Sequence, residues 1–415
     1  MYTLQVPKQK GFSLIEIMVG LIIGLLVTAV VVSVFRVFEG QKRTTTGNSD
    51  AQTNGAIALF NLQRDAQLAG FALPVYGSDF SPFNCPINTT IDHDNNAGTA
   101  AIGLSPIVIT DGNGANGSDT IAIRFGDSMK GGIAVEMQAG TATNVVQVDN
   151  NIGCTFNDVA LVINPSGAAL NCSMMRVGPS PTGVTATGIT PAKVTLSATT
   201  NVAVGNSLSC LGVWNEVQYA VTANQLTRSG TVTTGVPSAI AVPMVPDIVN
   251  MQAQYGISAS ANSNQVTQWV NATGAFANAA TTPTLANRNL IKAIRIAVVA
   301  RNGLLETANV TDTCSSRTAA KPTGLCAWDG AAAGSQAPAI DLSADANGSV
   351  IVTVFMKLLF QLKILYGLGA CCEFSPTSTF ALKKYTTWRS TVFGHDSFSS
   401  YVACGSCAYS LGRYQ

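Results

Sequence analysis

The sequence predicts an α+β protein in which one long N-terminal helix packs on a β-rich outer domain. Two observations support this prediction. An uncharged apolar run near the N-terminus continues into a segment with helical spacing, and short apolar runs separated by turn-forming residues follow it. Candidate strands among these runs include residues 120–125, 160–163, 217–221 and 291–299. We divide the chain into a leader (1–11), a helix (12–70), an outer domain (71–347) and a tail (348–415).

The composition argues against several classes of function. The 23 Lys and Arg residues nearly balance the 22 Asp and Glu residues, so the chain has no basic field that would attract nucleic acid. Only two histidines occur, His93 and His395, and no nucleophile-elbow or HExxH pattern is present. Residues 111–119 have oxygen side chains at spacings similar to a calcium loop but lack the distal Glu, so we expect a hairpin loop. We predict no catalytic site, no metal site and no cofactor.

The apolar run is long enough to cross a membrane. Residues 17–35 include 19 uncharged positions, which as a helix would extend roughly 28 Å. An ordinary signal anchor would show the same run. Glu16, directly before the run, argues against an ordinary anchor, because a carboxylate at that position is costly and usually functional. If the chain is cut between Gly11 and Phe12, the new α-amine lies one helical turn from Glu16 and the two charges compensate one another.

The segment Gly11-Phe-Ser-Leu-Ile-Glu16 resembles the prepilin peptidase signal of type IV pilins and type II secretion pseudopilins. The resemblance implies cleavage after Gly11, N-methylation of Phe12 and a role for Glu16 in docking subunits into a filament. It also implies a pilin-like fold, with the leader in the cytoplasm, the helix in the inner membrane, and the outer domain in the periplasm and then in the pilus. The implied partners are prepilin peptidase, other minor and major pilins and the inner-membrane assembly platform.

The helix is predicted in two halves, a membrane half (12–38) and an amphipathic half (about 48–70), with a polar break at residues 44–48. Spacings of three and four place apolar residues on one face of the second half: Leu59, Leu62, Ala66 and Ala69. Arg64 and Asp65 are expected on the other faces. The apolar face would therefore cover a sheet of the outer domain.

Several segments follow one another in order over roughly residues 11–300, namely residues 50–55 with 62–70, 117–124, 217–221 with 226–230, 245–256 and 291–298. Together they resemble the PilW family of minor pilins. The resemblance implies a low-abundance subunit that primes or caps type IV pilus assembly. A type II secretion pseudopilin and a pilus-tip adhesin stay open as alternatives, although the outer domains of pseudopilins are usually smaller.

Two pairs of cysteines are candidate disulfides. Cys314 and Cys326 bracket a short loop that closes easily in the periplasm, and Cys154 with Cys172 forms a second candidate. The spacing assigns no partner to two further cysteines, Cys85 and Cys210.

The tail differs in composition from the outer domain. With codons chosen among synonyms, residues 347–367 can be encoded by DNA whose shifted frame reads WQRYRYSFYETVIPIKDIIW, a string that resembles the PilW family ending. We therefore interpret 348–415 as an out-of-frame tail with no register matched to the sheet and poor packing. We expect no chemistry from its cysteines and histidine: Cys371, Cys372, Cys404, Cys407 and His395.

Overall fold

A computed structural model of the 415-residue chain provides the structure. The residues that it describes are 11–74, 85, 104–129, 133–138, 143–151, 153–166, 169–179, 192–200, 205–232, 236–278, 283–305, 326–328 and 351–361. Residues 379–415 lie outside the described residues.

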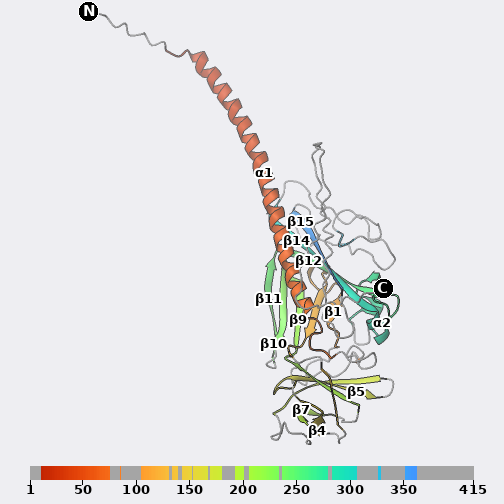
Figure 1. Ribbon diagram of the computed structural model, residues 1–415. Coiled ribbons are helices and arrows are strands. Elements are labelled where there is room, and N and C mark those ends of the chain that lie inside the picture. Colours follow the sequence, from red (N-terminus) through yellow and green to blue (C-terminus); the bar gives the residue numbers. More distant parts are fainter. Residues whose placement is uncertain are drawn as a thin grey trace, which may run out of the picture. The chain divides into compact units, whose positions relative to one another are not determined.

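The N-terminal helix α1 (Leu14–Gln67) is continuous (Figure 1). The predicted break at residues 44–48 is wrong, because this polar stretch stays helical. The hydroxyls of Thr44 and Thr45 donate to backbone carbonyls four residues earlier, at 3.1 and 2.9 Å, so these polar groups are satisfied within the helix. Gly47 is buried, and a Cβ atom at this position would collide with the Asn302 side chain. The glycine therefore marks a close approach of the helix to the outer domain.

Two antiparallel sheets form the body of the outer domain. The five-stranded sheet has the order β1-β2-β9-β10-β11, and the four-stranded sheet has the order β13-β12-β14-β15. The strands of the first sheet are β1 (Ile107–Thr110), β2 (Thr120–Phe125), β9 (Asn215–Thr222), β10 (Gln225–Val232) and β11 (Val236–Pro246). Those of the second are β12 (Ile248–Ser258), β13 (Val266–Val270), β14 (Ile291–Leu305) and β15 (Ile351–Gln361). A short helix α2 (Leu285–Leu290) precedes β14.

One apolar core joins the second half of α1 to both sheets. The helix contributes residues on one face, namely Ala51, Ala58, Leu59, Leu62 and Ala66. The strands contribute alternating side chains such as Ile121, Ile123, Val217 and Ile296. The predicted amphipathic half and the candidate strands at 120–125, 217–221 and 291–299 are therefore confirmed, and so is the pilin-like α+β fold.

Strand β15 comes from the segment for which we expected no matching register. Its backbone pairs with β14 from Ile351 opposite Leu305 to Gln361 opposite Ala293. A run of residues with high β-propensity can continue a sheet through backbone hydrogen bonds alone, whatever its side-chain alternation. The expected absence of register is thus wrong for residues 351–361. The reading frame of the tail stays a prediction, and residues 362–415 lie outside the described residues.

A small barrel is inserted between β2 and β9, which are themselves paired neighbours. Its strands are β3 (Val135–Glu136), β4 (Thr143–Val148), β5 (Val159–Ser166), β6 (Ala169–Arg176), β7 (Ala192–Thr200) and β8 (Ser207–Gly212). The strands pair in the orders β3-β8-β5-β6 and β4-β7. Isolated bridges from Met137 to Val148 and from Val177 to Leu196 connect the two groups, so each strand has two neighbours and the ring closes. Strand β5 contains the candidate strand 160–163, which confirms that prediction.

Candidate functional site

The proposed cleavage junction lies directly before the helix. Gly11, Phe12 and Ser13 are non-helical and exposed, and the helix begins at Leu14. Ser13 is the N-cap residue, with an extended backbone conformation. The peptide bond between Gly11 and Phe12 is therefore presented on an exposed, non-helical segment, the type of conformation that proteases bind.

Glu16 and Ser13 form a capping box. The backbone N–H of Ser13 donates to Glu16 Oε2 at 3.0 Å, and the backbone N–H of Glu16 donates to Ser13 Oγ at 3.3 Å. The carboxylate thus satisfies an N–H group at the helix start and places a negative charge at the positive end of the helix dipole. The structure gives Glu16 a definite local partner, which the spacing of charges in the sequence did not reveal.

The first half of α1 presents apolar side chains to its surroundings on all sides. An 18-residue window of this helix has a mean hydropathy of 2.9, and none of that window is buried within the protein. Phe12, Ile15, Leu21 and Leu25 are each more than half exposed. Around Gly20 and Gly24 an added Cβ would meet no atom within 4 Å, so a neighbouring helix has room to approach there. Such a helix has the length and composition to cross a membrane.

Asp65 connects the second half of α1 to the five-stranded sheet. Its carboxylate is buried and accepts hydrogen bonds from Tyr219 Oη at 2.7 Å and from Arg228 Nε at 2.8 Å. Burial by itself would raise the pKa of Asp65, but the hydrogen bonds from Arg228 and Tyr219 hold the pKa below its ordinary value. We name Asp65, Tyr219 and Arg228 the helix clamp.

The position of Asp65 corrects the sequence analysis. Arg64 is exposed, with 55% of its side chain accessible, but Asp65 lies on the buried face. Periodicity placed both charges outside because it cannot detect two polar partners more than 150 residues away along the chain.

Residues 111–119 form the loop of the β1–β2 hairpin, as predicted. Asp119 is buried and accepts hydrogen bonds from the N–H groups of Gly112 at 2.9 Å and Ala253 at 2.6 Å. Burial raises the pKa of Asp119 to about 7, although these two hydrogen bonds oppose the shift. The Asn250 and Gln252 amides also donate to loop carbonyls at 2.8 and 2.9 Å. The loop oxygens therefore attach the hairpin to β12.

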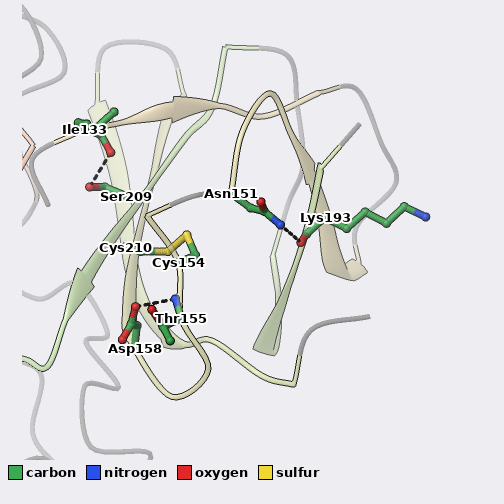
Figure 2. The surroundings of a disulfide bond; sticks show 8 residues. All are labelled: Ile133, Asn151, Cys154, Thr155, Asp158, Lys193, Ser209 and Cys210. Atoms are coloured by element: carbon green, nitrogen blue, oxygen red, sulfur yellow. Dashed lines mark hydrogen bonds between the residues drawn. A yellow bond between two sulfur atoms is a disulfide. The ribbon is translucent and has the colours of Figure 1, made fainter. Parts of the chain in front are cut away.

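Two disulfides are described, and they differ from the predicted pairing. Cys85 bonds to Cys172, and Cys154 bonds to Cys210 (Figure 2). The predicted pair of Cys154 and Cys172 is wrong because Cys172 lies on the outer face of the barrel, whereas Cys154, in the connection between β4 and β5, packs against the barrel interior. Cys172 packs with Leu161 and Met174 outside the barrel, whereas Cys210 belongs to the barrel interior and Cys154 packs against it.

Local hydrogen bonds also hold the loop that carries Cys154. Figure 2 shows the Asn151 amide donating to the Lys193 carbonyl at 3.3 Å and the Thr155 N–H donating to Asp158 Oδ2 at 2.7 Å. A small pocket of about 110 Å³ opens beside the disulfide and is lined mainly by apolar side chains. The disulfide therefore fixes the β4–β5 connection to β8.

Cys326 is disulfide-bonded, but Cys314 lies outside the described residues, so that predicted pairing stays a prediction. Residues 326–328 pack against the other face of β12 and β14. The Arg295 guanidinium lies over both Trp328 and Trp269, at 4.4 and 4.8 Å from the ring centroids. His93, His395 and the tail cysteines also lie outside the described residues. Within the described part of the chain, no group of three or more His, Cys, Asp or Glu residues could hold a metal ion.

Comparison with models of protein families gives two matches. Residues 6–32 match the prokaryotic N-terminal methylation motif, and residues 216–327 match the model of type IV pilus-assembly protein W. The methylation motif and the apolar helix, which is the one candidate membrane span within the described residues, fit a pilin anchored in the inner membrane. The second match shows that residues 216–327 are similar to type IV pilus-assembly protein W, and it confirms the resemblance to a PilW-like type IV pilin found in the sequence. No curated protein and no solved structure gave a significant match.

The two matches cover different parts of the site. The first includes the cleavage junction, Glu16 and the exposed apolar helix, and the second begins within β9 and includes two members of the helix clamp, Tyr219 and Arg228. The barrel strands, which end at Gly212, lie outside both matches. The matched families are structural pilins and not enzymes.

Proposed function

We propose that this chain is a minor pilin that is processed by prepilin peptidase and is needed for the assembly or priming of type IV pili. In this role it interacts with other minor and major pilins and with the inner-membrane assembly platform. Its contribution is structural and not catalytic. The observation that carries the proposal is the Gly11–Phe12 junction, exposed and non-helical, directly before a capped apolar helix.

Removal of residues 1–11 would create a new charged group beside Glu16. The free α-amine of Phe12 would precede Ser13, whose N–H already donates to Glu16 Oε2 at 3.0 Å. A cation and a carboxylate at the start of an apolar helix reduce one another's cost of burial in lipid. The same carboxylate could instead pair with the amine of a neighbouring subunit, which is how Glu16 would guide docking into the filament.

The disulfides support a periplasmic location for the outer domain. Both described disulfides lie in or beside the barrel, far along the chain from the membrane helix. Disulfides form and persist in oxidising compartments such as the bacterial periplasm. The leader would then stay in the cytoplasm, within reach of the peptidase, while the rest of the chain enters the periplasm and later the pilus.

Mass spectrometry of the full chain, extracted from membranes of a host that contains prepilin peptidase, tests the processing. We expect an N-terminus at N-methylated Phe12. A Gly11→Val variant should keep the leader, because a branched side chain at the junction blocks the close approach that glycine permits. An intact Met1 terminus in wild-type protein from this host would contradict the proposal.

A second experiment tests the role of Glu16. Glu16→Ala should insert normally, since it deletes a charge from the membrane helix, but incorporation into pili should fall sharply. Ser13→Ala serves as a control that removes half of the capping box and keeps the carboxylate. Normal piliation in a strain whose only copy is Glu16→Ala would refute the docking role.

A further inference from the structure

Strand β11 ends the five-stranded sheet and exposes a continuous apolar run. All five residues 240–244 are exposed, with Ile240 at 74% and Val242 at 53%. None of the five is charged. An uncharged apolar edge of this kind promotes aggregation unless another surface covers it. We call residues 240–244 the β11 patch.

The β11 patch lies beside α1, on the face of the sheet that the helix covers. Val242 stands directly opposite Arg228 of β10, and residues directly opposite one another project from the same face. Arg228 in turn reaches Asp65 of α1 at 2.8 Å. Figure 1 shows β11 running along the flank of the helix, in agreement with the contacts between these two elements. A partner that packs beside α1 would therefore meet the patch.

The edge of β11 is poorly suited to the addition of another strand. Pro237, Pro243 and Pro246 interrupt it, and proline has no N–H to donate. A partner would have to pack through side chains. A helix packs through the side chains of its apolar face and needs no hydrogen bonds from the strand edge, because its backbone groups are satisfied internally. A second helix is thus the element that fits this strip.

We propose that the β11 patch is the docking surface for the N-terminal helix of another pilin-type subunit anchored in the same membrane. The proposal rests on the proposed function, which supplies such neighbours. A neighbour anchored in the same bilayer would have its helix parallel to α1. Two copies paired antiparallel through β11 would instead place their membrane helices at opposite ends, because β11 runs along α1. The contact is therefore between unlike surfaces, with β11 on one side and a helix on the other.

Photo-cross-linking in pilus-producing cells tests the occupant. The full chain carries p-benzoylphenylalanine in place of Val242, and a matched protein carries it in place of Phe156, an apolar residue of the barrel that is 64% exposed. We expect the Val242 position to cross-link to a different pilin-type protein, with the modified peptide in that protein's N-terminal helix. No product above the Phe156 level would overturn the proposal. A cross-link within the same molecule, to a second copy of this chain, or to the outer domain of another pilin would also overturn the proposal.

Substitutions at the same positions test the importance of the contact. Val242→Glu should lower the number of pili by roughly tenfold, the factor that corresponds to about 1.4 kcal/mol of lost binding. Phe156→Glu should leave piliation unchanged, and both variants should keep the thermal unfolding midpoint because both positions are exposed. Wild-type piliation by Val242→Glu would overturn the inference.

The two proposals can fail separately. If Phe12 is the processed terminus and the chain is required for pili, but the Val242 cross-link is absent, only the docking surface is refuted. If the leader stays on and the chain is dispensable for pili, the proposed function fails, and the cross-linking result still decides whether the patch binds a helix.

Discussion

The helix-bearing sheets and the inserted barrel of this protein are stabilised by different means. The sheets share an apolar core with α1, and a buried carboxylate at Asp65 ties the helix to β9 and β10. The barrel closes on its own interior and is cross-linked by the Cys154–Cys210 disulfide. The sheet region therefore depends on contacts between distant parts of the chain, whereas the barrel depends on strand closure and a covalent bond.

The same division appears in the family matches. The start of α1, up to residue 32, and the strands from β9 to β14 lie within the matched segments, whereas the rest of α1, β1, β2 and the barrel strands lie outside them. Because β2 and β9 pair directly, the sheet is continuous across the insertion point. The barrel is therefore an insertion between two paired strands of one sheet. The predictions below test whether the two regions respond independently.

The largest effect should come from the tail, which supplies the edge strand of the four-stranded sheet. If the frame shifts near Asn347, restoring the alternative frame would replace β15 and everything after it with a sequence matched to the sheet. We expect the restored protein to be more resistant to proteolysis and to recover piliation in a strain that lacks its own copy. Limited proteolysis of both forms, together with the DNA sequence around codon 347, checks this. A present form that resists cleavage throughout 348–415, with no gain on restoration, would contradict the frame interpretation.

The next effect should come from the helix clamp. Asp65→Ala leaves the buried Tyr219 hydroxyl and the Arg228 guanidinium without their carboxylate and should lower the free energy of unfolding by about 4 kcal/mol. Arg64→Ala removes only the exposed third partner of Asp65, whose Nε lies 3.2 Å from Oδ1, and should lower stability by less than about 1 kcal/mol. Hydrogen exchange should show faster opening in α1 and β9 of the Asp65 variant, with the barrel unchanged. Equal effects in both regions would show that they unfold together.

Local patterns in the sequence predicted most of the sheet region. Spacings of three and four identified Leu59, Leu62 and Ala66 as core residues, and alternation identified β2, β9 and β14. The same rules failed where a residue's environment depends on distant partners. The sequence predicted a helix break around Gly47, whereas this glycine lies within the helix and against Asn302. The sequence also predicted that Asp65 is exposed, whereas it is buried by its contacts with Tyr219 and Arg228.

The disulfides show the same limitation in the barrel. Sequence spacing joined Cys154 to Cys172 because they bracket a short segment, but pairing depends on which face of the sheet each side chain occupies. Closure of the barrel depends on two isolated bridges, Met137 with Val148 and Val177 with Leu196, and no local sequence pattern predicts them. The capping box at Ser13 and Glu16 was missed for a different reason, because a Ser followed three residues later by Glu is a local helix-start signal that the sequence analysis did not use.

A smaller effect is expected from the barrel disulfide. Replacing Cys154 and Cys210 together by serine should lower the free energy of unfolding by about 3 kcal/mol, because the bond closes a loop with a sequence separation of 56. Replacing Cys85 and Cys172 provides a control that removes the disulfide outside the barrel. Hydrogen exchange should be faster in β4, β5 and β8 of the first variant. Faster exchange in α1 of that variant would contradict independent stabilisation of the two regions.

The last prediction concerns the pH dependence of stability and depends on Asp119, which joins the β1–β2 hairpin to β12. The change expected for each pH unit is smaller than the effects of the substitutions above. Burial raises the pKa of this carboxyl from 3.8 to about 7, so the folded protein holds a proton that the unfolded chain releases near pH 4. Stability contributed by this group is therefore fully present below about pH 4 and is lost progressively as pH rises to about 7. One proton changes the free energy of unfolding by at most about 1.4 kcal/mol per pH unit.

Asp65 acts in the opposite direction and in another pH range, since its lowered pKa contributes stability above about pH 4 that is lost at more acidic pH. Urea unfolding at several pH values between about 4 and 7 therefore reports on the carboxyls whose pKa burial raises, Asp119 and Asp158, and comparison with an Asp119 variant separates the two. Asp119→Asn should flatten the decline in stability across this range, although its amide cannot accept from both Gly112 and Ala253 and should weaken the fold at every pH. An unchanged slope in the variant would show that the buried carboxyl does not hold a proton, and that the hydrogen bonds from the hairpin and β12 are sufficient to keep it ionised.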